Sequence, residues 1–352
     1  MTEGNGDSAV VWRAVPHAYL RFRDGTVVMG APEADRHVTL PTRRGVLLWE
    51  ALHLGGTVDD LAAASSLDRD EVAALVNQLA GAGTITPTPP AGSSISFHDA
   101  LMHARSRGRT DEAFGPGIAD SGARDIEPSA LIVLPPVPPD RLDSGITFTQ
   151  VLDRRRTTRD WSREDLSLEQ VSEFLWRLGH SRPDEDGRPR SYPYPYAGPD
   201  GCERLALAAG RVVGLAPSLY LYEPTQHALR KVTPRLRGEA ARLPLGQYLA
   251  SVAAAQRVGD RHPQAMLVVM SDLERMSRAY QGIAYANVLK TTGVILATAS
   301  LCATVAGLGS TIIGLASDED FLDLYAEALP GFSCTGELAL GVPLTTADNE
   351  RR

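Results

Sequence analysis

One long apolar stretch limits what this chain can fold into. Residues 291–309, TTGVILATASLCATVAGLG, are long enough to cross a bilayer as a helix. Threonine, serine and several alanines interrupt the stretch, which favours a helix buried inside a globular core. A second apolar segment, QAMLVVMSD at 264–272, is typical of a central strand. We therefore expect a large core containing this helix and strand, and no membrane segment.

Composition narrows the function further. The chain has 352 residues, enough for two domains, and a net charge of -8, which argues against a general nucleic-acid binder. Its three cysteines are far apart and form no disulfide framework, and its eight histidines lack metal-ligand spacing. The N-terminus has neither a basic start nor an apolar run, so we expect no signal peptide. Together these features predict a cytoplasmic protein without a metal site.

The N-terminal part predicts a small winged-helix-like domain over residues 15–88. Residues 17–30 predict a hairpin around an Asp-Gly turn, and 37–41 a third short strand. Three helical patterns follow, the second capped by Thr57 and the third, 68–83, with apolar residues on one face. From Asp70 to Gly83 the third helix carries two acids and no Lys or Arg, which disfavours DNA. Peptide binding at a strand edge and a structural or dimerisation role remain alternatives.

The rest of the chain predicts a connector and a larger α+β domain. Residues 89–146 are rich in Gly, Pro and Ser, with one helix and a Pro-rich strap, LIVLPPVPPDRLDSG, that we expect to lie across another surface. Residues 147–352 mix strands and helices without regular βαβ alternation. We expect one long helix over 278–309.

The arginine cluster in DRRRTTRDWS, residues 153–162, is the first feature that indicates a ligand. A helical reading puts Arg155 and Arg159 on one face, where their guanidinium groups can bind a phosphate. The alternative is a solvated helix end whose arginines complement the helix dipole. No dinucleotide fingerprint, P-loop or nucleophile elbow is present.

The ordered segments of the chain resemble a known family. RRTTRDWS is similar to the Arg-x-Ser/Thr-x-Arg flavin motif of the nitroreductase fold. YPYAGPDGCERLALAA, GLAPSLYLYEPTQHAL, GLGSTIIG and LALGVP follow in the order of the SagB-type azoline dehydrogenases, which use FMN. The resemblance implies a nitroreductase-like FMN fold, a mixed sheet sandwiched by helices, that forms a homodimer with flavin sites at the subunit interface.

The resemblance also implies site residues. The first flavin motif falls on Arg155, Arg156, Thr157 and Arg159. Their side chains would reach the phosphate, the ribityl chain and the pyrimidine edge of FMN. The Pro-Ser-Ala-Gly segment, which lies against the flavin ring, falls on Pro195, Tyr196, Ala197 and Gly198, with Tyr196 in place of Ser. The stretch passing over the ring falls on Gly309, Ile313 and Gly314, and Arg351 or Arg352 is a candidate to close on the phosphate.

The chain departs from this family at one position. The family has a Lys-Tyr pair ahead of the long helix that is thought to abstract a proton, and the matching residues here are Ala279 and Tyr280. Arginine is a poor base, so Arg278 cannot replace the lysine. Tyr280 is a candidate base if Arg278 lowers its pKa, and Lys290 is another if burial lowers its pKa. A snorkelling or ion-paired role is the alternative for Lys290.

The sequence thus predicts an FMN-dependent oxidoreductase that converts peptide thiazolines or oxazolines to thiazoles or oxazoles. Its partners would be an azoline-containing precursor peptide and a cyclodehydratase. Two alternatives remain: another redox enzyme of the same fold, such as a reductase, and a catalytically degenerate scaffold that recruits the peptide.

Overall fold

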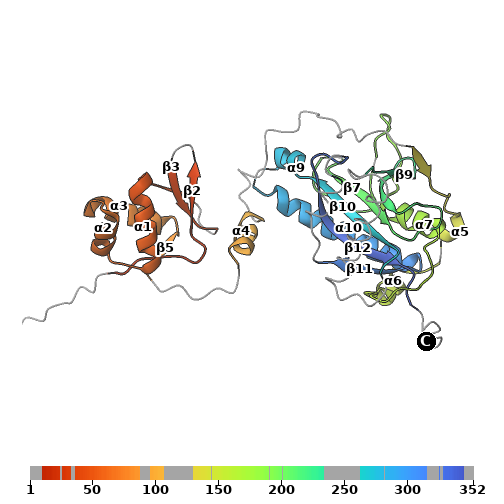
Figure 1. Ribbon diagram of the computed structural model, residues 1–352, viewed down its shortest axis with the longest axis horizontal. Coiled ribbons are helices and arrows are strands. Elements are labelled where there is room, and N and C mark those ends of the chain that lie inside the picture. Colours follow the sequence, from red (N-terminus) through yellow and green to blue (C-terminus); the bar gives the residue numbers. More distant parts are fainter. Residues whose placement is uncertain are drawn as a thin grey trace, which may run out of the picture. The chain divides into compact units, whose positions relative to one another are not determined.

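The computed structural model describes residues 10–23, 26–32, 36–87, 96–106, 130–143, 145–189, 191–199, 201–233, 262–280, 282–314, 325 and 328–344. The chain divides into two compact units, Met1–Arg109 and Thr110–Arg352. Figure 1 colours the first red to orange and the second from yellow to blue. We describe each unit by itself.

The N-terminal unit combines two small sheets with helices. Strands β2, β3 and β4 form an antiparallel sheet in that order, and β1 pairs with β5. The strands are β1 Arg13–Ala14, β2 Tyr19–Arg23, β3 Thr26–Gly30, β4 Val38–Leu40 and β5 Ile85–Thr86. The helices are α1 Thr42–Leu54, α2 Val58–Ser65, α3 Arg69–Gly81 and α4 Phe97–Ser106. The hairpin, third strand and three helices expected from the sequence are all present.

Local chemistry explains where these helices start. Thr57 and Asp60 form a reciprocal capping box at α2, and Asp68 caps α3. The expected apolar face of α3 is buried in the core of the unit. Helix α4, which we expected in the connector, packs on this unit instead: the ring of Phe97 lies 6.4 Å from that of His17 and 5.8 Å from that of Tyr19.

The C-terminal unit is built on a seven-stranded sheet with the order β11-β12-β10-β7-β8-β9-β6. Every pairing between these strands is antiparallel, and parallel contacts occur only at isolated bridges such as Thr157–Ser310. The strands are β6 Leu131–Val133, β7 Glu203–Ala209, β8 Ser218–Glu223, β9 Ala228–Lys231, β10 Ala265–Asp272, β11 Gly309–Ile313 and β12 Phe332–Gly341. The apolar segment expected as a central strand is β10, all of whose residues are buried.

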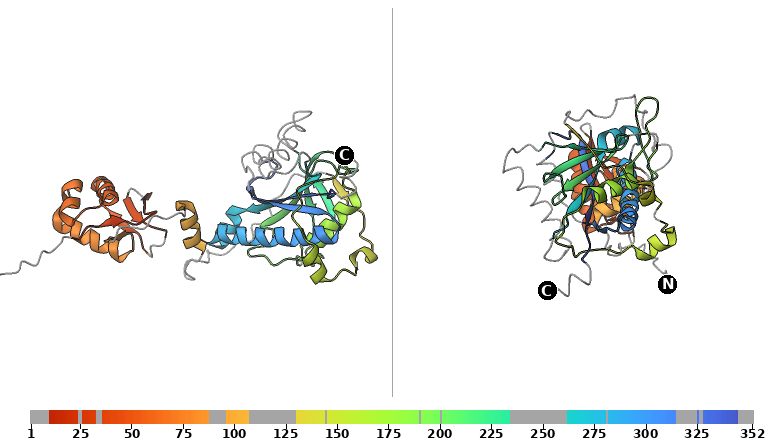
Figure 2. Two further views of the ribbon diagram at one scale, coloured as in Figure 1. Left: turned by 90° about the horizontal axis from the view of Figure 1, so that it is seen from below. Right: turned by 90° about the vertical axis from the view of Figure 1, so that its right-hand side faces the viewer.

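Two helices cover one face of this sheet. Helices α7, Leu168–Gly179, and α10, Ala284–Val305, share one core with the odd-numbered residues of β7 and β10. Figure 2 shows α10 lying lengthwise along this unit as a layer separate from the strands. The even-numbered residues face a second core that contains Trp161. A strand buried on both faces reads as continuously apolar, which explains the sequence of β10.

The prediction of one uninterrupted helix over 278–309 is wrong, because the helix is broken. The structure has α9, Leu273–Ala279, then a break, then α10. Tyr280 is extended (φ -130°, ψ 109°) and Gly282 is left-handed (φ 76°), so the helix cannot continue through them. By length and composition α10 could cross a membrane, but half of its most apolar window is buried against the protein.

The Pro-rich strap lies across the larger unit, as expected. Its β6 pairs with β9, and its short helix α5, Pro139–Leu142, places Arg141 against the buried Glu173 of α7 at 2.9 Å. Arg177 binds the other oxygen of Glu173, also at 2.9 Å. Ser172 donates a hydrogen bond to the Pro135 carbonyl. The strap is therefore attached by both backbone and charged contacts.

Candidate functional site

The arginine segment is not helical where its cationic residues lie. Helix α6, Phe148–Arg154, begins with a capping box at Thr147 and ends before the motif. Arg155 already has extended geometry (φ -53°, ψ 124°). In extended chain, alternate side chains share a side. The helical face expected for Arg155 and Arg159 is thus wrong. An extended backbone predicts instead that they share a side with Thr157.

Main-chain pairing holds this segment against the edge strand β11. Thr157 forms a parallel bridge with Ser310, the Thr158 N–H donates to the Ser310 carbonyl at 2.9 Å, and the Thr311 hydroxyl donates to the Thr158 carbonyl. Farther along, the Ser162 N–H donates to the Val342 carbonyl at 2.9 Å. The backbone of the segment is consequently fixed by contacts that leave its odd-numbered side chains available.

The three motif arginines differ in their contacts. Arg156 folds back on the helix end, where its Nη1 donates to the carbonyls of Asp153 and Arg155. Arg155 is half-buried and Arg159 is exposed. Neither has a hydrogen-bond or ion-pair partner within the described part of the chain. Arg155 and Arg159 are therefore the two guanidinium groups in a position to bind an anion.

The Pro195–Gly198 segment lies against α9 and α10. The Ala197 N–H donates to the Thr291 hydroxyl at 3.2 Å. Gly198 has φ 122°, and a Cβ there would lie 2.6 Å from Met276 Cε. Only glycine fits both the backbone conformation and this close approach. The Tyr280 ring comes within 4.0 Å of the same position.

The two candidate bases have different surroundings. Tyr280 is half-buried at the break between α9 and α10, beside Gly198. Arg278 forms an ion pair with Glu274 at 2.5 Å, so its charge is balanced on its own helix. Lys290 is exposed and follows Leu289 on the outer side of α10, so the burial that a role as base required is absent within one protomer.

Tyrosines surround the second segment. The rings of Tyr192 and Tyr194 stack at 5.4 Å, and Tyr196 meets Tyr192 edge-on at 5.5 Å. Burial raises the pKa of Tyr194 above its ordinary value. Glu203 lines a small cavity with Tyr192 and Tyr194, and its Oε1 has no hydrogen-bond partner in the described structure. Burial raises the pKa of Glu203 to about 7.

The structure thus gathers the predicted residues into two groups. The arginine group comprises 155–159 and the β11 segment from Gly309. The tyrosine group comprises 195–198 and Tyr280. The hydroxyl of Ser310 in the arginine group lies 3.3 Å from that of Ser300 on α10, whereas Ala197 in the tyrosine group contacts Thr291 on the same helix. Ser300 and Thr291 are about 13 Å apart in helical rise, so the two groups are separated along α10.

Three predicted residues of the arginine side need separate comment. The Ile313 side chain is buried in the core, and Ile312, with 47% exposure, faces outward, because side chains alternate along β11. The assignment of Ile313 to the stretch over the flavin ring therefore stays a prediction that concerns its backbone. Gly314 is exposed at the end of β11. Arg351 lies outside the described residues.

Sequence reasoning missed the residues that position these groups. Thr158 packs so tightly on β11 that a Cβ at Gly309 would lie 2.7 Å from its methyl group. Thr291 holds the backbone of Ala197. Two signals were available: a threonine next to the arginines, and threonines inside the otherwise apolar helix. A hydroxyl in an apolar helix needs a hydrogen-bond partner.

The arginine group fits the phosphate of FMN. Arg155 and Arg159 flank Thr157 on a backbone fixed by hydrogen bonds, and their guanidinium groups have no partner among the described residues, which suits bidentate binding of a dianionic group. No cluster of His, Cys, Asp or Glu that could hold a metal occurs among the described residues.

Comparison with known proteins identifies the class. The nitroreductase family model matches residues 152–330, just over half of the chain, and the chain belongs to this family. A nitroreductase-family protein of Methanocaldococcus jannaschii is 24% identical over 180 residues, covering 51% of this chain and 84% of that protein. Family membership makes this chain an oxidoreductase of the flavin type, with FMN as its cofactor.

Two solved structures are also similar. A nitroreductase-family protein of Anabaena variabilis has 15% identity and a TM-score of 0.49, covering 91% of this chain and 69% of its own. The Escherichia coli microcin synthetase McbBCD complex with truncated pro-MccB17 bound has 16% identity and a TM-score of 0.42, covering 76% of this chain and 87% of the matched chain.

Proposed function

We propose that this protein oxidises azoline rings in a peptide to azoles, with FMN as the electron acceptor. The observation that carries the proposal is the arginine segment: its backbone is fixed on β11, and the Arg155 and Arg159 guanidinium groups have no partner among the described residues. This arrangement supports the flavin motif, and the order of the other segments resembles the SagB-type azoline dehydrogenases. The FMN phosphate would lie against Arg155 and Arg159.

Tyr280 is the residue we propose for proton abstraction. Azoline oxidation removes two hydrogens, one as a hydride equivalent and one as a proton. FMN, when bound, supplies the hydride acceptor, and molecular oxygen would reoxidise it. The Tyr280 ring lies next to Gly198, within the segment that resembles the one beside the flavin ring. Lys290 is less well placed on the structure of one protomer, because it is exposed.

A homodimer is part of the proposal. Helix α10 leaves an apolar stripe uncovered at four-residue intervals: Tyr285 and Leu289 are 46% and 40% exposed, and Gly293 and Ala297 are also exposed. A second copy of the chain would cover this stripe and bring its own 195–198 segment to the interface. Light scattering at increasing concentration tests this, with Leu289→Asp as the variant expected to give monomer.

The substrate and partners follow from the same resemblance. The azoline would be carried by a precursor peptide and made by a cyclodehydratase from Cys, Ser or Thr. The winged-helix-like domain, residues 15–88, would recruit that peptide at a strand edge. β2 ends its sheet and displays Phe22 with 71% exposure, which supports this role. We place these reactions in the reducing cytoplasm.

A direct test uses purified protein and an azoline-containing peptide. We expect FMN absorbance in the preparation and a product lighter by two hydrogens without added NAD(P)H. Tyr280→Phe should lower kcat by about 10² or more, the range of general-base catalysis, while FMN absorbance is retained. A heavier product that requires NAD(P)H would contradict the azoline reaction.

A reductase of the same fold is the second candidate. It is favoured by Ala279 in place of the family lysine and by the engagement of Arg278 with Glu274. A flavin-free scaffold that recruits the peptide is the third. A preparation that stays colourless after FMN is added, yet binds the precursor peptide, would support the scaffold.

A further inference from the structure

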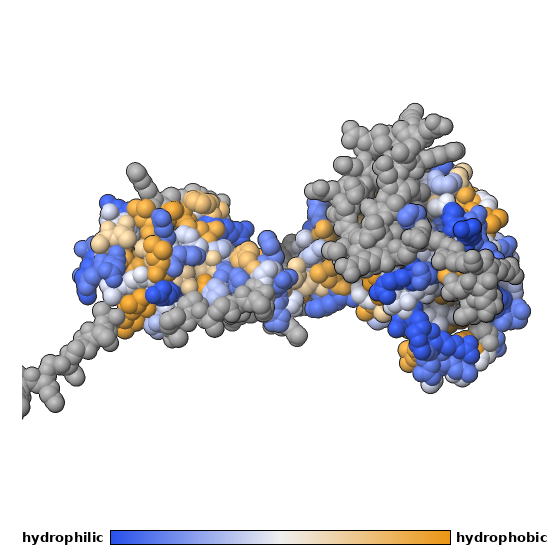
Figure 3. All heavy atoms as spheres, turned by 60° about the horizontal axis from the view of Figure 1, so that its bottom comes forward, coloured by the Kyte–Doolittle hydropathy of each residue, from blue (hydrophilic) through white to orange (hydrophobic). Residues whose placement is uncertain are grey.

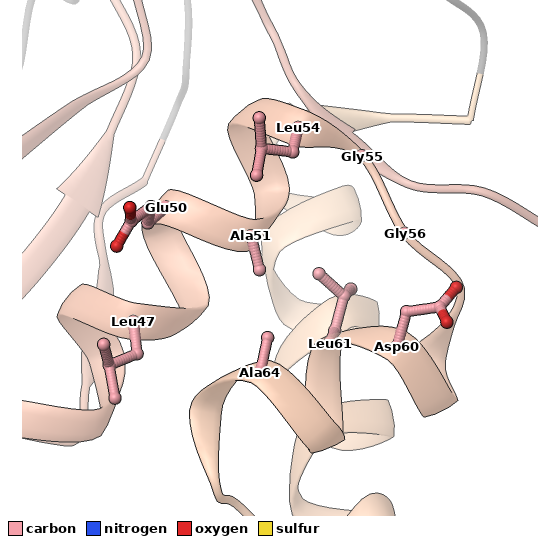
Figure 4. A pocket seen from close by; sticks show the side chains of 9 residues that line it. All are labelled: Leu47, Glu50, Ala51, Leu54, Gly55, Gly56, Asp60, Leu61 and Ala64. Carbon is pink, nitrogen blue, oxygen red and sulfur yellow. The ribbon is translucent and has the colours of Figure 1, made fainter.

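A groove between α1 and α2 of the N-terminal unit is unrelated to the flavin chemistry. Its volume is about 250 Å³, and Figure 4 shows the side chains around it. It is lined by Leu47, Glu50, Ala51, Leu54, Gly55, Gly56, Asp60, Leu61 and Ala64. Small-molecule pockets usually enclose roughly 300–1,000 Å³, so this groove suits one or two protruding side chains better than a whole ligand.

The wall of the groove is preformed. Gly56 exchanges two backbone hydrogen bonds with Trp12, of 2.8 and 3.1 Å, and Arg13 donates to the Leu54 carbonyl at 3.1 Å. Gly55 has φ 83°, which lets the chain turn out of α1. A Cβ at Gly56 would lie 3.0 Å from Asp60 Cβ and crowd this end of the groove. A fixed wall lowers the entropy lost on binding.

The middle of the groove is apolar and reachable from solvent. Leu61 forms a fully buried floor, whereas Leu47 and Leu54 are 41% and 76% exposed at its edges. In Figure 4, Ala51 and Ala64 lie across from one another, where short side chains leave the space open. Figure 3 also shows hydrophobic side chains gathered on the visible face of this unit. Exposed leucines around a cavity indicate a binding surface.

Both charged residues that line the groove are acidic, and the guanidinium of Arg13 lies in the wall, beside Gly55 and on the Leu54 carbonyl. Glu50 and Asp60 lie at opposite sides of the apolar centre, and none of the nine lining residues is Lys or Arg. Thr57 donates its N–H and hydroxyl to Asp60 Oδ2 at 3.0 and 2.7 Å, and these bonds lower the pKa of Asp60. Asp60 is therefore a fixed anion. An apolar floor between two carboxylates complements an aliphatic side chain next to a cation and repels phosphates.

We propose that this groove binds a peptide segment that presents a leucine-sized aliphatic side chain with a lysine or arginine within one helical turn of it. The aliphatic side chain would contact Leu47, Leu54 and Leu61, and the cation would pair with Glu50 or Asp60. The proposal goes beyond the redox function and does not depend on it. It also differs from strand-edge binding, because its contacts come from α1 and α2.

The test uses the full-length protein and three fluorescein-labelled helical peptides of equal length. The first combines Leu and Lys, the second Leu and Glu, and the third Ala and Lys. Fluorescence anisotropy should show binding of the Leu-Lys peptide, weakened by salt, and at least tenfold weaker binding of the other two. Equal binding of the Leu-Glu peptide, or of the Ala-Lys peptide, overturns the proposal.

Matched variants locate the binding surface. Ala64→Trp should fill the groove and weaken binding at least tenfold, whereas Ala63→Trp, one position along the same exposed helix and outside the groove, should not. Glu50→Lys should weaken binding and reduce its salt dependence, and Glu71→Lys on α3 is the charge-matched control. Equal effects of a variant and its control would place the peptide elsewhere and refute the proposal.

Two further readouts distinguish peptide binding from misfolding and from self-association. Circular dichroism reports whether each variant is folded, and flavin absorbance reports that the C-terminal unit still holds FMN; loss of peptide binding with the native spectrum retained then concerns the groove. Sedimentation without peptide tests for a second copy of this chain as the occupant. Self-association that Ala64→Trp abolishes and Ala63→Trp preserves would overturn the peptide in favour of that copy.

Discussion

The arginine group and the tyrosine group are positioned by different forces. Backbone hydrogen bonds to Ser310 and Val342 hold the arginine segment, and the side chains of Arg155 and Arg159 have no protein partners among the described residues. In the described part of the chain, the tyrosine group has one such bond, from Ala197 to Thr291, and otherwise depends on packing: Gly198 lies on Met276, and Tyr196 lies on the neighbouring Tyr192. The arginine group therefore presents positive charge to a ligand, whereas the tyrosine group presents the faces and an edge of aromatic rings.

Because of this difference, substitutions in the two groups should affect different quantities, cofactor affinity in the arginine group and folding free energy in the tyrosine group. Removing an unpartnered arginine takes little from the folded protein, so the loss should appear in cofactor affinity. Removing a packed group from the tyrosine side should cost folding free energy first. Three predictions test the distinction, from the largest expected effect to the smallest.

The double variant Arg155→Ala with Arg159→Ala should have the largest effect. Each hydrogen bond to a charged group contributes about 1.5–3 kcal/mol, so we expect FMN affinity to fall at least a hundredfold while the unfolding free energy changes little. Arg156→Ala is the control, since its guanidinium already binds the α6 carbonyls. Flavin fluorescence titration of the apoprotein measures the FMN affinity of the wild type, the double variant and the control. Retained affinity in the double variant would disprove the phosphate assignment.

Glu203 should make stability depend on pH near the tyrosine group. Its pKa is raised from 4.5 to about 7 by burial. Between these values the unfolded chain releases the proton and the folded chain keeps it, so the unfolding free energy falls as pH rises from about 4.5 to about 7. The total loss is about 3 kcal/mol. Urea unfolding of Glu203→Gln should lack this loss, and an unchanged pH profile in the variant would contradict the assignment.

Gly198 and Gly309, whose positions lie close to a neighbouring side chain, should differ in how far a second substitution restores the stability lost on replacement by Ala. Gly309→Ala and Gly198→Ala should each cost about 1–3 kcal/mol of unfolding free energy. Only Gly198 has a positive φ, so Met276→Ala should restore part of its loss, whereas Thr158→Gly should restore most of the loss at Gly309. Double-mutant cycles from urea unfolding isolate the couplings. Complete rescue at Gly198 would show that its backbone is unstrained.

Much of the fold was predictable from local patterns. Thr57, Asp68 and Ser167 each cap a helix that begins where the sequence indicates, because these caps depend on residues within one turn. The buried strand 265–272 and the buried helix after it follow from apolar content. The break at Tyr280–Ile283 was missed, since apolar residues continue on both sides of Gly282 and only its φ reveals the stop.

The candidate site was predictable in its residue types and less so in its geometry. Arg155 and Arg159 were assigned to one side for the wrong reason, helical spacing, because the sequence does not show that α6 ends at Arg154. The apolar neighbours of Lys290 left open whether it is buried or reaches solvent, and the structure places it on the outer side of α10. Thr158 and Thr291 carried no strong local signal, since their partners lie far away in the chain.

The sequence by itself determined the two-part organisation, the helix caps, the buried strand and helix, and the cationic motif that indicates a phosphate. These depend on neighbouring residues and on periodic apolar content. The tertiary structure decided which side chains of the motif share a side, which tyrosine lies beside Gly198, and which lysine is exposed. Such outcomes depend on hydrogen bonds and packing between segments more than ninety residues apart, such as Ala197 and Thr291, and no local pattern encodes them.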